Sequence, residues 1–415
     1  MSDHKGQFSD RPGHAVRQTT AAIPNAGSAT PSPAFEDVPA MLRAYRPERP
    51  VYCIYPEALR GRVRSFIDGF PGRVLYAVKA NDEPQLVRLI HESGVRHFDC
   101  ASLPEIELVD RECPGATSYF MIPARLRGAA REAHRAHGVR HFMLDHASGL
   151  DALASEVPLQ ECVVFVRMAV SHPAASLDLS AKFGAPPAEV PGLLQAVSGR
   201  GAEAALAFNV GSGVRDPDAY RHALEVATGV LRSLPVQLRL VDIGGGFPHR
   251  YPGFEVPSLE AFFQAVRSAH MGQWLAAEGE LLCEPGRALV APGVSAIVEV
   301  LLRKDDRLYL NDGMYGAFWE LRFKMQDRFP VRAFRDGTPL TGPDTLPFRL
   351  YGPTCDSSDM LPGRVSLPAG VRAGDHLEFG QLGAYSLAGR TRFNGHYSDT
   401  IVRIEGADAR PPGGA

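Results

Sequence analysis

The stretch HFDCASLPEIELVDRECPGATSYFMI, residues 97–122, decides the fold. It contains two short apolar runs, HFDC at 97–100 and SYFMI at 118–122, which are typical of buried strands. The segment between them, PEIELVDREC at 104–113, has its apolar positions at helical spacing. A strand, a helix and a second strand in so short a stretch predict one unit of a parallel sheet.

The same alternation runs from residue 74 to about residue 285. Helical segments such as DAYRHALEVATGVLRSL, 218–234, separate six further apolar runs. These runs are VLYAV (74–78), HFML (141–144), VVFVRM (163–168), ALAFNV (205–210), LRLVDI (238–243) and LLCE (281–284). Eight strand–helix units in about 210 residues predict an α/β fold, a (β/α)8 barrel of the TIM type.

After residue 290 the pattern changes to alternating β-type runs with turn residues between them, such as SAIVEVLLR and RLYLNDG. This pattern predicts an antiparallel β domain after the barrel. The two ends are rich in small residues and proline, which predicts disordered tails. The expected organisation is a tail at 1–35, a segment at 36–55 that joins the β domain, the barrel at 56–290, the C-terminal β domain at 291–405 and a tail at 406–415.

Charge and composition exclude several classes of function. The 415 residues carry a net charge of −3, which gives no electrostatic reason to expect nucleic acid or a membrane surface as partner. No apolar stretch is long enough for a membrane span, and the N-terminus lacks the apolar region of a secretory signal. The six cysteines form no CxxC pair, which indicates reduced thiols and a cytoplasmic protein. No metal is expected.

Polar residues cluster where the predicted strands end, which is the face where such barrels place their chemistry. In YAVKAN, 76–81, Lys79 directly follows an apolar strand and is expected to point into the barrel mouth. Burial lowers the pKa of an amine, and a neutral amine attacks an aldehyde. A lysine at a strand end is more often a solvated surface group, so this signal is weak by itself.

Three further strand ends carry signals for binding an anion. DIGGGFP (242–248) and AFNVGSG (207–213) leave backbone N–H groups accessible, and EPGR (284–287) supplies a guanidinium. An isolated glycine run is usually a turn, but three such elements on one face of a barrel favour a phosphate. Glu284 adds a carboxylate that can keep a pyridine nitrogen protonated and strengthen an electron sink, as loss of CO2 from Cα requires. The alternative is a structural ion pair between Glu284 and Arg287.

Together these motifs resemble the fold-type III pyridoxal-phosphate (PLP) decarboxylases, the group of ornithine, lysine, arginine and diaminopimelate decarboxylases. The resemblance covers about residues 50–404. The motifs that carry it, in the family's order, are YAVKAN, FDCAS followed by Glu105, DLSAKFG, VGSG, DIGGGFP, EPGR, LNDGMYGAF, YGPTCDSSDM, GAY and FNG.

The resemblance implies Lys79 as the Schiff-base lysine and Glu284 as the partner of the pyridine nitrogen. The other cofactor-binding residues that it implies are Asp99, Arg167, Asn209, Ser212, Gly244, Gly245, Gly246, Arg287 and Tyr385.

The same resemblance assigns part of the site to the β domain. Cys355 of YGPTCDSSDM would protonate Cα after CO2 leaves, and Asp356 would contact the substrate. The remaining substrate-binding candidates are Tyr315, Arg322, Lys324 and Phe393. Because the family completes each site with this segment of a partner subunit, it implies a homodimer with two shared sites. Lys182 of AKFG is expected to pair with Asp359 across that interface.

Two positions depart from the family pattern. Asn209 stands where the family has a histidine stacked on the cofactor ring, and an amide cannot stack as an aromatic ring does. Lys324 stands where ornithine- and lysine-type members carry an aspartate for the distal ammonium of the substrate. If residues 322–324 form a strand, Arg322 and Lys324 share one face, which favours a distal carboxylate. A shift of register would instead bring Asp327 into the pocket.

Competing functions remain open at this point. The expected activity is decarboxylation of a diamino acid, with an anionic distal group as one variant, in polyamine, siderophore or related biosynthesis. An ornithine or lysine decarboxylase proper is the first alternative. An amino-acid racemase of the same barrel type is disfavoured by Glu284 and the CD motif. A non-catalytic PLP-binding regulator would be a single-domain barrel, or would have lost Lys79 or Cys355.

Overall fold

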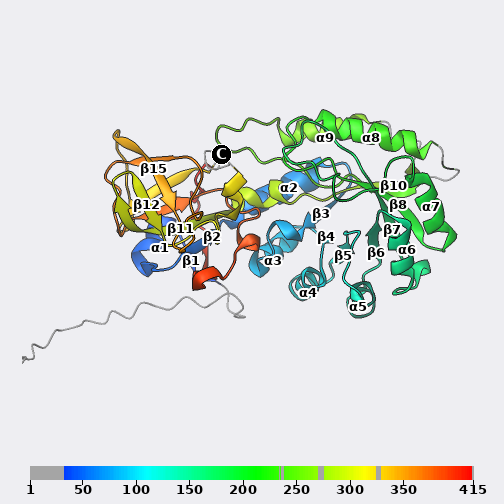
Figure 1. Cartoon of the computed structure of the whole chain (residues 1–415), viewed down its shortest axis with the longest axis horizontal. Helices are drawn as coiled ribbons and strands as arrows, with labels where there is room; N and C mark the ends of the chain where they lie inside the picture. The colour runs from blue at the N-terminus through cyan, green and yellow to red at the C-terminus, as the bar shows by residue number, and fades with distance from the viewer. Residues whose placement is uncertain (1–31, 233, 235–237, 270–274, 324–328, 414–415) are drawn as a thin grey trace, which may run out of the picture.

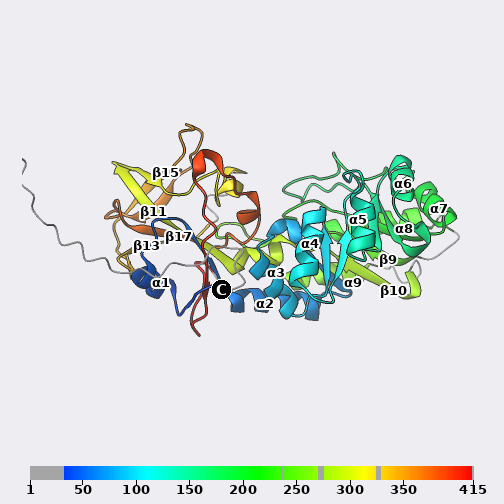
Figure 2. The ribbon, with the colours of Figure 1, turned by 90° about the horizontal axis from the view of Figure 1, so that it is seen from below.

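The computed structural model describes residues 32–232, 234, 238–269, 275–323 and 329–413. Within these ranges the chain forms a parallel barrel and a second domain built on a mostly antiparallel sheet (Figure 1). Helix α2 (Pro56–Gly69) lies beside the junction of the two domains in both views (Figures 1 and 2). The predicted fold class is therefore confirmed.

Eight parallel strands close the barrel, because β10 pairs with both β9 and β3. The strands are β3 (Arg73–Ala77), β4 (His97–Cys100), β5 (Thr117–Phe120), β6 (His141–Leu144), β7 (Val163–Met168), β8 (Glu203–Phe208), β9 (Leu238–Asp242) and β10 (Leu275–Cys283). The intervening helices are α3 (Pro84–Glu92), α4 (Leu103–Glu112), α5 (Ala129–Ala136), α6 (Ala147–Ala154), α7 (Val190–Gly199), α8 (Asp218–Leu231) and α9 (Leu259–Ser268). Three predicted strands have the observed bounds, and β10 begins six residues earlier than expected.

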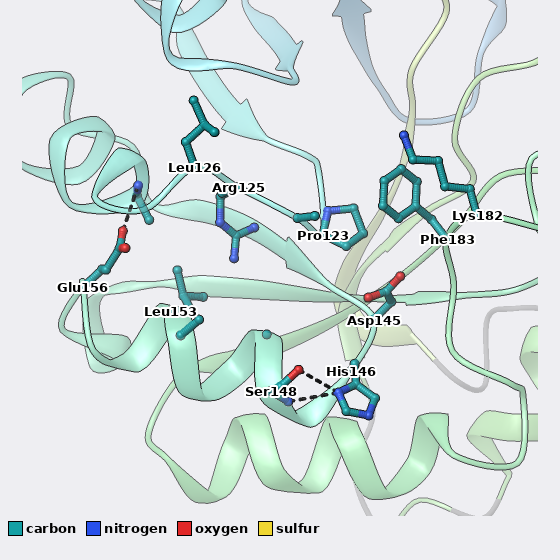
Figure 3. Close-up of a pocket in the computed structure, with 14 residues that line it drawn as sticks. Pro123, Arg125, Leu126, Asp145, His146, Ser148, Leu153, Glu156, Lys182 and Phe183 are labelled. Atoms are coloured by element: carbon teal, nitrogen blue, oxygen red, sulfur yellow. Dashed lines mark hydrogen bonds between the residues drawn. The ribbon is translucent and has the colours of Figure 1, made fainter.

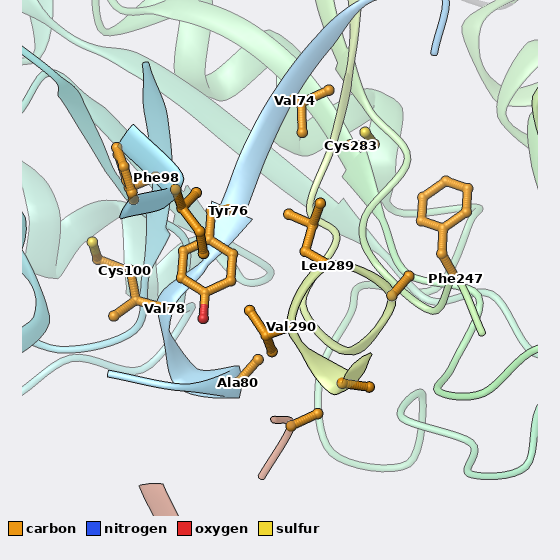
Figure 4. Packing of buried hydrophobic residues seen from close by; sticks show 14 of the residues in the cluster. Val74, Tyr76, Val78, Ala80, Phe98, Cys100, Phe247, Cys283, Leu289 and Val290 are labelled. Atoms are coloured by element: carbon orange, nitrogen blue, oxygen red, sulfur yellow. The ribbon is translucent and has the colours of Figure 1, made fainter. Parts of the chain in front are cut away.

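Alternation along each strand separates two buried layers. Leu75 of β3 belongs to a small cluster inside the barrel, with Tyr119, Met143 and Phe165. The next residue, Tyr76, belongs to the main core between strands and helices. Figure 4 shows Tyr76 in that layer with Phe98, Leu289 and Val290, the last two from α10 (Arg287–Val290). Because neighbouring residues face opposite sides, the polar residue Asp99 after Phe98 faces the barrel interior.

The second domain is built on a ten-stranded sheet with the main order β1-β18-β2-β11-β12-β15-β16. Its strands are β1 (Ala34–Phe35), β2 (Val51–Ile54), β11 (Val294–Lys304), β12 (Arg307–Leu310), β13 (Val331–Arg335), β14 (Thr338–Pro339), β15 (Thr345–Tyr351), β16 (Val365–Pro368), β17 (His376–Phe379) and β18 (Ile401–Ile404). Helix α1 (Val38–Tyr45) precedes β2. Three pairs are parallel, β1–β18, β18–β2 and β12–β15, so the expected antiparallel pattern holds for most of the sheet but not for all of it.

Both predicted tails require correction. Residues 1–31 lie outside the described residues, but Ala34 and Phe35 form β1 and pair with β18. At the other end, the segment 406–413 packs against the protein: Pro411 and Pro412 are buried, and Gln381 Nε2 donates a hydrogen bond to the Gly413 carbonyl at 2.7 Å. The small residues and prolines of this segment predicted disorder. A proline ring is apolar, however, so its burial against another part of the protein stabilises the ordered segment.

Candidate active site

Lys79 follows β3 in a short 3₁₀ turn and meets the carboxylate of Asp99 at the end of β4. Its Nζ atom lies 2.5 Å from Asp99 Oδ2, and the Asp99 side chain is fully buried while that of Lys79 is 43% exposed. Burial disfavours the charged amine, but the carboxylates of Asp99 and Glu284 outweigh burial, so the pKa of Lys79 lies above its ordinary value. The expectation that burial lowers this pKa is wrong, because the amine has an ionised neighbour.

Two more carboxylates stand at adjacent strand ends. Asp242 closes β9 and Glu284 follows β10, and both are buried. Burial raises the pKa of Asp242 to about 6, although hydrogen bonds with the Gly244 N–H and the Glu284 carboxyl act to lower it. Burial and the charges of Asp242 and Asp99 raise the pKa of Glu284 well above its ordinary value. One oxygen of each of the three carboxylates has no hydrogen-bond partner: Asp99 Oδ1, Asp242 Oδ2 and Glu284 Oε1. This arrangement can accept a positively charged or proton-donating group.

Glycines shape the backbone next to these carboxylates. Gly244 and Gly246 have φ values of +70° and +98°, which side-chain-bearing residues rarely adopt. A Cβ on Gly246 would lie 2.6 Å from the Gly211 carbonyl, so the two glycine loops approach closely. In the second loop the Asn209 amide oxygen accepts from the Gly211 N–H at 3.0 Å. Ser212 is bridged by backbone hydrogen bonds to Leu177.

Arg287, which follows the end of β10, contacts three side chains. Its Nη1 donates to the Tyr251 hydroxyl at 3.1 Å, its Nη2 pairs with the buried carboxylate of Glu320, and its guanidinium lies 5.1 Å from the centre of the Tyr385 ring. Tyr385 adopts a φ of +55° and its N–H donates to the Ala80 carbonyl, next to Lys79. The alternative ion pair between Glu284 and Arg287 is therefore wrong. Arg167, at the end of β7, stacks at 5.6 Å over Phe183.

A second group of predicted residues gathers in the β domain. The Tyr315 hydroxyl donates to Asp356, and the rings of Tyr315 and Phe393 lie 4.6 Å apart. This hydrogen bond lowers the pKa of Asp356, so the carboxylate is ionised at neutral pH. Cys355 is exposed, unlike the other five cysteines. Among the residues that the structure describes, no hydrogen bond, ion pair or ring contact joins this group to Lys79 or Glu284.

In the part of the chain that the structure describes, Arg322 does not lie in a strand. Residues Trp319–Phe323 form a 3₁₀ helix, η4, in which Arg322 lies 3.7 Å from the centre of the Trp319 ring. Lys324 and Asp327 lie outside the described residues. The condition that a strand runs through Arg322 is therefore not met, and the role of Lys324 stays a prediction. The ion pair between Glu320 and Arg287 places η4 beside the predicted phosphate site.

The expected pair of Lys182 and Asp359 would lie between two chains, so it stays a prediction. Asp359 is buried in its own chain, where it accepts hydrogen bonds from the Met314 N–H at 2.7 Å and from the Thr354 N–H and hydroxyl. Lys182 instead lines a cavity of about 410 Å³ beside the ends of β5 and β6, together with Phe183 and Arg125 (Figure 3). Neither Lys79 nor Glu284 lines this cavity.

These residues fit a PLP molecule. The unpartnered Glu284 Oε1 suits a protonated ring nitrogen, the close-packed glycines leave no room for side chains beside a phosphate, and Lys79 supplies an amine at the same face of the barrel. Barrel and site together define a PLP enzyme of the barrel type.

Comparison with known proteins agrees with this class. Residues 57–291 match the family described as "Pyridoxal-dependent decarboxylase, pyridoxal binding domain", and residues 254–383 match its "C-terminal sheet domain". The chain therefore belongs to the pyridoxal-dependent decarboxylases. It binds PLP and is a carboxy-lyase of the ornithine, lysine and arginine decarboxylase type.

Individual relatives support the same placement. The chain is 32% identical to the lysine/ornithine decarboxylase of Selenomonas ruminantium, covering 79% of this chain and 83% of that protein. It is 31% identical to antizyme inhibitor 2 of Xenopus laevis, and the match covers 79% of this chain and 74% of that protein. The crystal structure of the Paramecium bursaria Chlorella virus arginine decarboxylase bound to agmatine superposes with a TM-score of 0.76 at 26% identity, covering 88% of this chain and 98% of that one.

Three residues of the site were missed by sequence reasoning. Asp242 precedes the glycine run directly, so its position at a strand end was a usable signal. Glu320 and Tyr251 are recognisable only through Arg287, which both contact from distant parts of the chain. Nothing in the sequence indicates those contacts.

Proposed function

We propose that this chain decarboxylates a diamino acid at a site that holds PLP through Lys79. The observation that carries the proposal is the buried group of Asp99, Asp242 and Glu284 around one amine, next to glycine loops that suit a phosphate. PLP supplies the electron sink that takes up the electron pair of the broken Cα–carboxylate bond. Glu284 holds a proton at the ring nitrogen, and Asp99 orients the lysine amine.

The β-domain group is proposed to handle the substrate. Cys355 is exposed and stands next to Asp356, so its thiol can deliver a proton to Cα once CO2 has left. The anionic Asp356 is proposed to attract the distal ammonium of the substrate, and the Tyr315–Phe393 pair to cover its aliphatic chain. This favours the ornithine, lysine and arginine class of substrate, and a place in polyamine synthesis.

A second candidate is a substrate whose distal end is anionic, as in some siderophore-related pathways. Arg322 supports it, because it is a cationic side chain on η4, and η4 is joined to the predicted phosphate site through the ion pair of Glu320 with Arg287. The two candidates make opposite demands on the charged end of the substrate. Asp356→Asn should impair the first class and Arg322→Gln the second.

The testing experiment is a CO2-release assay with ornithine, lysine, arginine, diaminopimelate and their distally carboxylated derivatives. The proposal predicts turnover of at least one basic diamino acid, with kcat/KM lowered at least tenfold by Asp356→Asn. Release of CO2 from carboxylated derivatives alone would favour the second candidate. No CO2 from any member, with PLP bound, would contradict the proposal and leave a binding role like that implied by the name antizyme inhibitor.

We further propose a homodimer with two shared sites in the cytoplasm. Cys355 and Phe393 are exposed and Asp356 is half-buried, and none of the three has a described contact with the Lys79 site of the same chain. A second copy of the chain would bring the Lys79 part of its barrel to these β-domain residues and so complete the site. Five buried free thiols suit a reducing compartment. The described residues contain no helix with the length and apolar character of a membrane span.

A further inference from the structure

Asp242 and Glu284 stand at the ends of two neighbouring strands of the barrel. Strands β9 and β10 pair in parallel (Figure 2), and Asp242 lies opposite Leu282, which precedes Glu284 by two positions. The Glu284 N–H continues this pairing, because it donates to the Gly244 carbonyl at 2.9 Å. Leu240 and Leu282 belong to the cluster inside the barrel. Since alternate residues of a strand share one face, the side chains of Asp242 and Glu284 face the barrel interior as well.

The two carboxyls are buried and hydrogen-bonded to each other. Asp242 is fully buried and Glu284 is 7% exposed, and a hydrogen bond joins their side chains. In the part of the chain that the structure describes, only the Gly244 N–H donates to this pair, at 2.7 Å from Asp242 Oδ1. If both were carboxylates, Asp242 Oδ2 and Glu284 Oε1 would have no donor. A carboxylate offers acceptors alone, so a hydrogen bond between two carboxyls requires a proton on one of them.

The charges around the pair favour a shared proton. Lys79 and Asp99 act on both carboxyls, but they form an ion pair and balance each other. The phenol of Tyr119 on β5 and the thiol of Cys283 on β10 also act on the pair, and burial raises the pKa of both groups, which keeps them neutral. Two ionised carboxylates would therefore place two unbalanced charges in a buried site, whereas one shared proton leaves a single charge.

We propose that Asp242 is a positioning residue, which shares one proton with Glu284 and so fixes the orientation of that carboxyl. The orientation of Asp242 is itself fixed by the Gly244 N–H. This role rests on the proposed function, in which Glu284 holds a proton at the ring nitrogen of PLP. Asp242 adds the group through which Glu284 is held.

The proton can change its place without leaving the pair. Glu284 accepts a hydrogen bond from a protonated ring nitrogen when it is a carboxylate. The O–H bond on Glu284 then breaks, its electron pair stays on the Glu284 oxygen, and the proton forms an O–H bond on Asp242. Asp242 now donates to Glu284, so the hydrogen bond is kept with its direction reversed. The pair carries one negative charge before and after, and this charge balances the cationic ring.

Two variants of Asp242 separate this role from a role of its charge. In Asp242→Asn the amide offers a permanent donor to Glu284 and a carbonyl to the Gly244 N–H, so PLP affinity and kcat should stay within a few-fold of wild type. Asp242→Ala offers neither group, so Glu284 loses its support and kcat should fall at least tenfold. If Asp242 acted through a negative charge, both variants would be impaired alike.

Infrared difference spectroscopy at pH 7 detects the proton itself, because the C=O stretch of a protonated carboxyl lies apart from that of a carboxylate and shifts in heavy water. The free and the PLP-loaded protein should both show one such band that is absent from Asp242→Asn. Glu284→Gln should lack the same band, and the double variant should lose no further intensity, because the two carboxyls hold one proton. Asp68→Asn, at an exposed aspartate on α2, is the control and should leave the band unchanged.

Three results would overturn the proposal. No protonated-carboxyl band in the difference between wild type and Asp242→Asn would show that the pair holds no shared proton. A further loss of intensity in the double variant would show two separate protons. Unchanged kcat and PLP affinity in Asp242→Ala, folded by circular dichroism, would show that Asp242 does not position Glu284. A protein that keeps the band but releases no CO2 would support the shared proton and contradict the proposed function alone.

Discussion

Asp99, Asp242 and Glu284 place three buried carboxylates around one lysine amine. One cation cannot balance three anions in a desolvated site, so the structure raises the pKa of Asp242 and Glu284 and leaves an oxygen of each carboxylate unpartnered. A ring nitrogen that carries a proton corrects this imbalance at Glu284. Single residues therefore define the kind of cofactor that the site accepts.

The role of Glu284 gives the first prediction. In Glu284→Gln the amide cannot hold a proton on the ring nitrogen, so kcat should fall by about 10²–10³-fold while PLP remains bound. Steady-state CO2 release and the visible absorption of bound PLP measure the two effects. Glu107→Gln, an exposed glutamate on α4, is the matched control. A kcat within a few-fold of wild type would show that Glu284 does not tune the cofactor.

The second prediction concerns Lys79 and pH. Asp99 holds the pKa of Lys79 above its ordinary value, so only a small fraction of the amine is neutral and able to attack an aldehyde at pH 7. Replacing Asp99 with asparagine should lower this pKa and shift the pH dependence of PLP uptake by the apoprotein toward lower pH. Stopped-flow absorbance from pH 6 to 10 measures the shift. The exposed neighbour Asp82→Asn should leave the profile unchanged, and an unshifted Asp99→Asn profile would refute the assignment.

At the scale of secondary-structure elements, the sequence predicts the bounds of a strand correctly where burial alone determines them. Strands β4, β6 and β7 have the predicted bounds because short apolar runs in a closed barrel are buried on both faces. The segment WELRF, 319–323, was predicted as part of a strand because alternating apolar and polar residues are typical of strands. Contacts with distant residues stabilise it as η4 instead, chiefly the pairing of Glu320 with Arg287 and the packing of Trp319 against Gly389.

The glycine loop after β9 gives the third prediction. In Gly246→Ala the new Cβ would meet the Gly211 carbonyl at 2.6 Å, at a φ that costs alanine about 1–2 kcal/mol. The two loops must then separate, and PLP affinity should fall at least tenfold. Gly253→Ala shares the positive φ but has open space around it, so it isolates the backbone cost from the clash. Equal PLP affinities of the two variants, from equilibrium dialysis, would exclude a phosphate at this loop.

The opposite end of the barrel gives the fourth prediction. Burial and the charge of Arg73 lower the pKa of His97 and His141 to about 4. Between pH 6.5 and 4 the unfolded chain binds protons that the folded chain does not, so stability decreases as the pH falls through this window. The loss should be on the order of 1–2 kcal/mol per histidine between pH 6.5 and 5.

Urea unfolding at pH 7.5, 6.5 and 5 measures this dependence. His141→Phe keeps the ring stacked on Tyr119, removes a titrating group whose Nδ1 has no partner, and should reduce the loss at pH 5. His222→Phe, on the exposed face of α8, is the control. If His141→Phe loses as much stability at pH 5 as wild type does, His141 is not the sensor.

At the scale of the whole molecule, the candidate site occurs in two parts. The barrel holds Lys79 and Glu284, and the β domain holds Cys355 and Asp356, without a described contact between the two sets. The order of the motifs predicts both sets of site residues, because it resembles that of a known family. The sequence contains no physical signal that indicates which of two chains contributes each set to a site. Packing between copies depends on surfaces assembled from the whole fold.

Mixing two inactive variants tests the shared site most directly. Lys79→Ala removes the barrel part and Cys355→Ala the group that protonates Cα after CO2 has left, so neither homodimer should form the amine product. When subunits reassort at equal amounts, half of the dimers are mixed and each contains one intact site, so the account predicts about a quarter of the wild-type rate of amine formation. No recovery of activity, with subunit exchange shown by native mass spectrometry, would contradict it and place Lys79 and Cys355 in the site of a single chain.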